Sequence, residues 1–205
     1  MATIPICRTS ASSLPAKRCS WLLAVISIAA AAAQTSADPG GALYSRPFDA
    51  FQNKTLAQKV QELADREEIR ELVARYAHRV AHGVSLADLF TDDGAFIVRM
   101  PGRPAMETRG RAALDRQFAT IAAVAAQHPT LPMIHNYLLQ ISGNEATGTC
   151  SIEIRTTENG HSVVGSGYYE DRYRREHGRW KFVVRDAHFF HWVTLQEGWA
   201  SAPAQ

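Results

Sequence analysis

One histidine stands alone in an apolar strand pattern. His135 alternates with Met133, Tyr137, Leu139 and Ile141, so a regular β-strand would place all five side chains on one face. Imidazole is suited to proton transfer near neutral pH, and apolar neighbours would exclude competing water. We therefore predict that His135 is a general acid/base or a ligand contact. The alternative is a neutral core histidine that bonds a hydroxyl or a carbonyl.

A second pair of titratable groups lies on the last predicted strand. Asp186 and His188 alternate with Phe190, so Asp186 could orient His188 or His135. A β-bulge in this strand would reverse the faces. Tyr76, on a helix, could offer its hydroxyl to a substrate oxygen or pack its ring in the core. The catalytic set expected from the sequence is His135, Tyr76, Asp186 and His188.

Two helical histidines raise the question of a metal site. His78 and His82 are four residues apart, a spacing that can direct two imidazoles to one ion. No glutamate lies between them as in zinc proteases, and no clear third ligand follows. We therefore expect surface histidines and no metal.

Hydrophobic periodicity predicts helices first and a sheet last. A short helix begins at Thr55, and a longer amphipathic helix begins at Asp65, which could cap it, and ends at Gly83. A third helix covers residues 110–128. Alternating apolar residues predict strands over residues 95–100, 106–109, 133–141, 145–157, 161–174 and 179–195. The predicted fold is α+β, a strongly bent antiparallel sheet wrapped around N-terminal helices.

The N-terminal segment is typical of an export signal. Arg8, Lys17 and Arg18 precede an apolar run from Trp21 to Ala33 that is short for a membrane span. We expect residues 1–37 to be a signal peptide, 38–54 a linker or arm, 55–196 the folded domain and 197–205 a tail. The protein would then be periplasmic or secreted, without a stable membrane anchor. An uncleaved anchor is the alternative.

Composition limits the partners of the chain. Its 205 residues include 22 Lys+Arg and 20 Asp+Glu, and removal of residues 1–37 would leave 19 basic and 20 acidic residues, a net charge of −1. This balance argues against nucleic acid as a partner. Cys150 would be the single cysteine of the mature chain, so no internal disulfide could form.

Several stretches resemble the SnoaL-like branch of the nuclear transport factor 2-like superfamily. They are residues 63–76, 86–96, 110–114, 132–136 and 168–182. The resemblance implies a cone-shaped barrel whose mouth holds an apolar pocket. It also implies the activities of such proteins, which include dehydratases, dehydrochlorinases, polyketide cyclases and ketosteroid isomerases, although some members have no catalytic function.

The resemblance also suggests roles for individual residues. His135 takes the position of the general-base histidine, whereas the aspartate that orients this histidine is replaced by Ala81. That dyad is therefore broken here. A second catalytic histidine position falls near Cys150, and Tyr169 falls near a polar substrate contact. The residues expected to line the pocket are Tyr137, Tyr169, Cys150, Phe96, Phe118 and Phe190.

The sequence thus favours a cofactor-independent lyase, such as a dehydratase, or an isomerase. Its substrate would be a small hydrophobic molecule, aromatic or polyketide-like, and histidine would act as general acid/base in an apolar pocket. The alternative is a non-catalytic small-ligand-binding or dimerisation module of the same fold. A homodimer is expected in either case.

Overall fold

The computed structural model describes residues 51–128 and 130–200. The predicted signal peptide, most of the predicted linker and the last five residues of the predicted tail lie outside the described residues. The elements in chain order are α2 (Leu56–His82), the 3-10 helix η1 (Ala87–Leu89), β1 (Phe90–Arg99), β2 (Met106–Arg109), α3 (Arg111–Gln127), β3 (Leu131–Ser142), β4 (Glu145–Glu158), β5 (His161–Glu176) and β6 (Arg179–Thr194).

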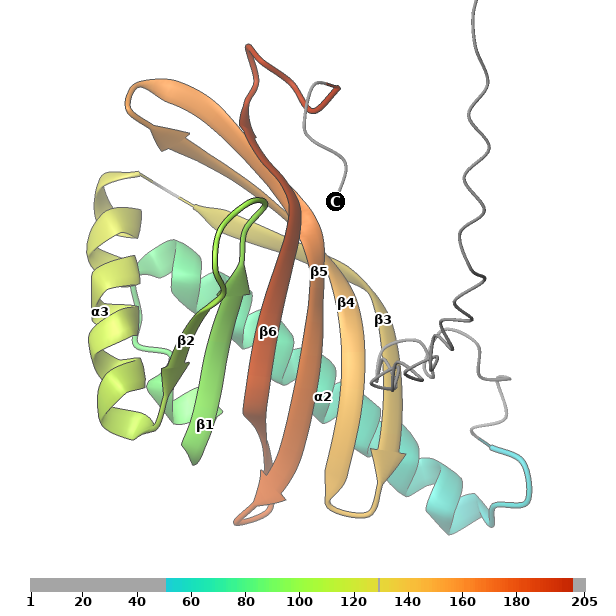
Figure 1. Cartoon of the computed structure of the whole chain (residues 1–205). Helices are drawn as coiled ribbons and strands as arrows, with labels where there is room; N and C mark the ends of the chain where they lie inside the picture. Colours follow the sequence, from blue (N-terminus) through green and yellow to red (C-terminus); the bar gives the residue numbers. More distant parts are fainter. Residues whose placement is uncertain (1–50, 129, 201–205) are drawn as a thin grey trace, which may run out of the picture. The chain divides into compact units, whose positions relative to one another are not determined.

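The six strands form one curved sheet in the order β2-β1-β6-β5-β4-β3. Helix α2 lies across its concave face, and α3 lies beside β1 and β2 (Figure 1). The predicted α+β class and the bent sheet around helices are confirmed. Two details differ from the prediction, because β1 pairs with β6 in parallel and the sheet stays open between β2 and β3. The long connection from β1 to β6 makes the parallel pairing possible.

Helix α2 is continuous, so the predicted helix start at Asp65 is wrong. Thr55 and Gln58 form a reciprocal capping box at its first residue. No glycine or proline interrupts the segment from Leu56 to His82. Asp65 is instead a buried residue of the helix interior, and its carboxylate binds tertiary partners. Gly83 ends the helix in the left-handed conformation, at φ 63°, as predicted.

Aromatic side chains fill the space between α2, α3 and the sheet. The ring centroid of Phe90 lies 5.1 Å from that of Phe182 and 5.3 Å from that of Phe118. Full burial of such a side chain contributes roughly 1.5–3 kcal/mol relative to exposure. This core holds both helices against the sheet. Within residues 51–128 and 130–200, no helix combines the length and apolar character of a membrane span.

Bulges in β3 and β6 decide which side chains enter the interior. In β3 the pairing with β4 jumps from His135–Ser151 to Leu138–Thr149, and Asn136 adopts a positive φ of 58°. In β6 the pairing with β5 skips Val183 and Phe190. Each extra residue reverses the alternation of faces beyond it.

Candidate functional site

Arg185 lies on the inner face of β6 and has no exposed surface. The bulge at Val183 turns it inward, since regular alternation from the buried Phe182 would point it outward. Its guanidinium carbon lies 3.6 Å from the ring centroid of Tyr169 and 4.2 Å from that of Tyr76. Stacking on aromatic faces stabilises a cation where water is excluded. Strands β5 and β6 and helix α2 together fix this charge.

Asp171 on β5 is the direct cross-strand partner of Arg185. Its Oδ2 atom lies 3.5 Å from Nη1 of Arg185 and accepts a 2.7 Å hydrogen bond from the Tyr173 hydroxyl. Burial raises the pKa of Asp171 to about 6, although the arginine and the tyrosine bond both oppose that rise. Burial is the largest single influence on Arg185 and lowers its pKa, but Asp171, Tyr169, Cys150 and Tyr76 together outweigh burial and raise the pKa overall. The pair is therefore charged at neutral pH.

Several polar atoms of this ion pair make no hydrogen bond with any described residue. In the described part of the chain, Nε, Nη1 and Nη2 of Arg185 and Oδ1 of Asp171 are buried without a hydrogen-bond partner. Each such group costs about 1–3 kcal/mol. Buried polar groups normally find partners, so unpaired ones call for an explanation, of which a bound ligand is one.

The groups around the pair are neutral at physiological pH. Burial raises the pKa of Tyr76 and Tyr169, and it raises that of Cys150 to about 12. The hydroxyls can therefore donate hydrogen bonds but do not act as bases. Asp171 is the member of this cluster whose pKa lies close to neutrality. The cluster thus combines one proton acceptor, one fixed positive charge and several neutral donors.

An apolar rim borders the concave face at one end of the sheet. Strands β1 and β6 end there and β3 begins there, because β1 runs parallel to β6 and β3 runs opposite to it. Half-buried apolar side chains at this end pack against the core, namely Val98, Met100, Ile134, Tyr137 and Trp192. A hydrophobic ligand approaching the cluster from this end would meet this rim.

His135 does not share a face with Tyr137, so the predicted strand face is wrong. The bulge at Asn136 separates them: Tyr137 packs against the core, whereas the side chain of His135 is exposed. Asn136 donates a 3.2 Å hydrogen bond to the Ser151 hydroxyl. The structure therefore places His135 outside the buried cluster.

Asp186 and His188 are neighbours as predicted, but they lie on the outer face of the sheet. The bulge at Val183 reverses the faces of this strand, so Asp186 and His188 lie on the side opposite to the buried Phe182. Asp186 accepts bonds of 2.9–3.1 Å from Arg99. Burial raises the pKa of Asp186, but the bonds from His188 and Arg99 outweigh it and lower the pKa overall.

His188 makes its own contacts on this outer face. Its Nε2 lies 3.4 Å from Asp186 Oδ1 and 3.6 Å from Glu170 Oε2, and its ring stacks on that of Tyr168 with centroids 4.6 Å apart. Phe190, expected in the pocket, is 47% exposed and lies beside Tyr168. Neither His188 nor Phe190 reaches the interior cluster.

Six of the predicted site residues do belong to the interior. Tyr76, Tyr169 and Cys150 surround Arg185, and Tyr137 lies close enough to Cys150 for the thiol to affect its pKa. Phe96 and Phe118 pack together in the core, with ring centroids 5.5 Å apart. Sequence reasoning missed Arg185, Asp171 and Tyr173. The available signal was charge within otherwise apolar alternation: Arg185 alternates with Ala187 and Phe189, and Asp171 alternates with Tyr169 and Tyr173.

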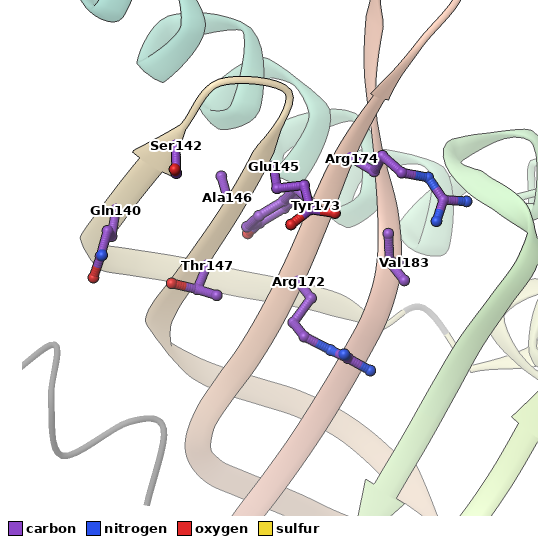
Figure 2. Close-up of a pocket in the computed structure, with 9 residues that line it drawn as sticks. All are labelled: Gln140, Ser142, Glu145, Ala146, Thr147, Arg172, Tyr173, Arg174 and Val183. Atoms are coloured by element: carbon purple, nitrogen blue, oxygen red, sulfur yellow. The ribbon is translucent and has the colours of Figure 1, made fainter.

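A hollow of about 290 Å³ lies near the β3–β4 turn (Figure 2). Figure 2 shows Arg172 and Tyr173, adjacent on β5, extending to different sides of the sheet. Arg172 is exposed, whereas Tyr173 is 2% exposed. The hollow therefore gathers mostly outward side chains, and the sheet separates Arg172 from the ion pair.

The described residues include no group of three or more side chains arranged to hold a metal ion. His82 Nδ1 lies 2.7 Å from the backbone carbonyl oxygen of His78, and the two rings are 6.5 Å apart. His82 therefore bonds within its own helix.

Comparison with known proteins gives the chain a family. The SnoaL-like domain family matches residues 61–186. No curated protein matches the sequence. Among solved structures, an NTF2-like protein with a cystatin-like fold from Novosphingobium aromaticivorans is 27% identical over 70% of this chain and 92% of that chain, with a TM-score of 0.54.

Two further structures show the same fold at lower identity. A protein of Novosphingobium aromaticivorans proposed to be a scytalone dehydratase is 19% identical over 66% of this chain and 91% of that chain, with a TM-score of 0.58. A type 2 hexachlorocyclohexane dehydrochlorinase is 20% identical over 67% and 93%, with a TM-score of 0.53. The fold family includes dehydratases and isomerases. Since the family match spans more than half of its length, the chain belongs to the SnoaL-like domain family.

Proposed function

We propose that this chain is a cofactor-independent lyase or isomerase that acts on a small hydrophobic molecule, aromatic or polyketide-like, inside the curved sheet. One observation carries the proposal. Arg185 and Asp171 form a buried ion pair, and the three guanidinium nitrogens of Arg185 and Oδ1 of Asp171 lack hydrogen-bond partners in the described residues. The proposal keeps the acid–base reaction predicted from the sequence. It assigns the proton transfer to Asp171 instead of His135.

Each residue of the cluster would have a distinct role. In an elimination, Oδ1 of Asp171 would take a proton from carbon, because Oδ2 is held by Tyr173. The electron pair of that C–H bond would form the new double bond as the hydroxyl group departs. Tyr76 would give this hydroxyl a proton, so that it leaves as water, and would recover a proton from Asp171. Arg185 would stabilise negative charge that develops on a substrate oxygen.

An isomerisation would use the same groups without a leaving group. Asp171 would take a proton from one carbon and return it to another. Arg185 would stabilise the intermediate enolate, where a low dielectric strengthens its effect. The two reactions differ in the substrate and not in the residues that this site would need.

A non-catalytic ligand-binding module is the second candidate. The complete burial of Arg185 among three aromatic rings favours it, because these contacts would hold the arginine without any chemistry. Breaking a buried ion pair is often strongly destabilising, so loss of activity must be separated from loss of folding.

Turnover of a panel of hydroxylated aromatic dimers and polyketide-like alcohols tests the proposal, with absorbance of the conjugated product as the signal. Asp171→Asn is expected to lower turnover by roughly 100-fold or more, with the fold intact by circular dichroism. Asp115→Asn makes the same chemical change at an exposed site of α3 and should keep the wild-type rate.

His135→Ala decides between the two assignments of the base. Full activity of this variant supports Asp171. An inactive His135→Ala beside an active Asp171→Asn would return the role to His135 and overturn the assignment. Tight binding of panel compounds without turnover by the wild type would favour the ligand-binding module.

Export and homodimer formation remain predictions from the sequence. N-terminal sequencing of the protein recovered from the cell envelope or the medium tests the first, and light scattering of the purified protein tests the second.

A further inference from the structure

We infer that the interior site binds an anionic ligand through Arg185 and that Asp171 takes up a proton as the anion binds. The inference rests on the proposed function, because it concerns the same site. The ligands concerned are apolar molecules that carry an anionic oxygen. They resemble the enolate of the proposed isomerisation, which would exist only after Asp171 has taken the proton from carbon.

The geometry of Arg185 leaves its donors free for a ligand. A guanidinium presents five N–H donors in its plane. The rings of Tyr169 and Tyr76 lie against the guanidinium group, 3.6 and 4.2 Å from its carbon. The 3.5 Å separation from Asp171 is longer than a charge-assisted hydrogen bond of about 2.7–2.9 Å. Tyr76, Tyr169 and Cys150 lie close enough to the guanidinium to interact with it electrostatically. None of its three nitrogens, however, has a hydrogen-bond partner of normal geometry within the described residues.

An anionic oxygen fits these donors better than a neutral one. The planar fork of arginine matches the two oxygens of a carboxylate. A buried anion requires a paired cation, and the buried Arg185 is that cation. A neutral ligand oxygen could accept one bond but would gain less from the buried charge.

Asp171 must respond when a second anion reaches Arg185. The titratable groups around Asp171 come from every element packed against it. They are Tyr173 on its own strand, Arg185 on β6, Cys150 on β4, Tyr137 on β3, Tyr76 on α2 and Asp186 on the outer face of β6. Burial already raises the pKa of Asp171 to about 6, and only Arg185 and the Tyr173 bond oppose it.

Two carboxylates that share one guanidinium disfavour each other's charge. Asp171, whose pKa is already raised by burial, therefore takes a proton. Protonated Asp171 could then donate from Oδ1, its unpaired oxygen, to the second oxygen of the ligand. The occupied site would hold one cation, one anion and one neutral acid. The guanidinium nitrogens of Arg185 and Oδ1 of Asp171 would then have hydrogen-bond partners on the ligand.

Isothermal titration calorimetry of the full chain with benzoate tests this inference, with benzamide as the neutral probe. At pH 7 the benzoate enthalpy should differ between phosphate and Tris buffers by an amount that corresponds to about one proton taken up per anion. Benzoate affinity should rise by up to tenfold per pH unit as the pH falls from about 8 towards 6. Benzamide should bind at least tenfold more weakly, without buffer dependence.

Three variants locate the effect. Arg185→Gln should weaken benzoate binding at least tenfold. Asp171→Asn should keep the binding and lose the proton uptake, a result that a merely structural role would not produce. Arg172→Gln, at an exposed arginine adjacent to Asp171 on the other face of β5, should change neither quantity. Circular dichroism of each variant checks folding.

Benzoate that does not bind, that binds without proton uptake, or that binds Arg185→Gln as well as wild type overturns the inference. The proposed function is judged separately, by turnover of the uncharged panel. Turnover without benzoate binding would overturn this inference and leave the proposed function standing. Proton-coupled benzoate binding without turnover of the panel would support this inference and overturn the proposed function.

Discussion

Tyr173 donates a 2.7 Å hydrogen bond to Oδ2 of Asp171, and both residues are 2% exposed. This bond leaves Oδ1 as the free oxygen of the carboxylate. It also favours the charged form of Asp171 and so opposes the effect of burial on its pKa. Tyr173 is therefore a positioning residue that sets both the orientation and the basicity of the proposed base.

Tyr173→Phe should raise the pKa of Asp171 further above about 6, because the variant loses a hydrogen bond to the carboxylate. We expect a shift of about one unit, since one pKa unit corresponds to about 1.4 kcal/mol, close to the contribution of one such bond. Carbon-13 NMR titration of labelled aspartate measures it without reference to activity. An unchanged or lowered pKa would show that burial alone controls Asp171.

The stability of the domain should carry the signature of Asp171. Its folded pKa of about 6 lies above the unfolded value of about 3.9, so between these values the folded state binds more protons. The stability contributed by this group is complete below about pH 4 and is lost as pH rises through 6. The free energy of unfolding of wild type minus that of Asp171→Asn should therefore fall over this range, by an amount on the order of 1–3 kcal/mol.

Asp186 should affect the pH dependence of the free energy of unfolding in the opposite direction and therefore serves as a control. Its folded pKa is lowered overall, so its contribution is present at neutral pH and is lost as pH falls through the folded pKa. Urea denaturation between pH 3 and 8 compares wild type with both asparagine variants. Equal slopes for Asp171→Asn and Asp186→Asn would contradict the assignment of the two environments.

Asp65 should act as a tertiary anchor of α2 rather than as its cap. It accepts bonds from Arg175, from Gln61 at 2.9 Å and from Trp180 Nε1 at 3.5 Å. Asp65→Asn should lower the free energy of unfolding by about 1–3 kcal/mol, because it leaves the Arg175 charge without its counterion.

Glu67→Gln is the matched change on the same helix. The Glu67–Arg70 pair is exposed and 3.7 Å apart, so this variant should stay within about 0.5 kcal/mol of wild type. Urea denaturation measures both, and a loss at Asp65 no larger than that at Glu67 would rule out the anchor.

Local patterns were sufficient to predict the fold class. The α2 stripe through Ile69, Val73 and Tyr76 and the Asn159-Gly160 turn report on neighbours that are close in sequence. The parallel contact of β1 with β6 joins segments about 90 residues apart, and no local pattern encodes it. The false helix start at Asp65 arose because a buried aspartate has the same sequence signature as a capping aspartate.

The site was predicted less well because single inserted residues decide it. A period-two pattern assigns His135 and Tyr137 to one face, yet the bulge at Asn136 separates them. The bulge at Val183 has the same effect, because it places Arg185 in the interior where regular alternation would place Asp186. A bulge depends on pairing with the neighbouring strand, so one strand's sequence does not reveal it. Tyr76 was placed correctly because helical periodicity has no comparable interruption.

Gly167 tests whether a bulge in β6 is built into the sequence. A Cβ atom at this position would overlap the backbone carbonyl oxygen of His188, next to the residues where β6 skips a pairing. Gly167→Ala should therefore lower the free energy of unfolding by about 1–3 kcal/mol or more, since backbone must move. Gly148→Ala should cost less, because the atoms in its way include the flexible end of Leu139. Urea denaturation compares the two, and a tolerated Gly167→Ala with a damaged Gly148→Ala would mean that the β5–β6 pairing can relax without the bulge.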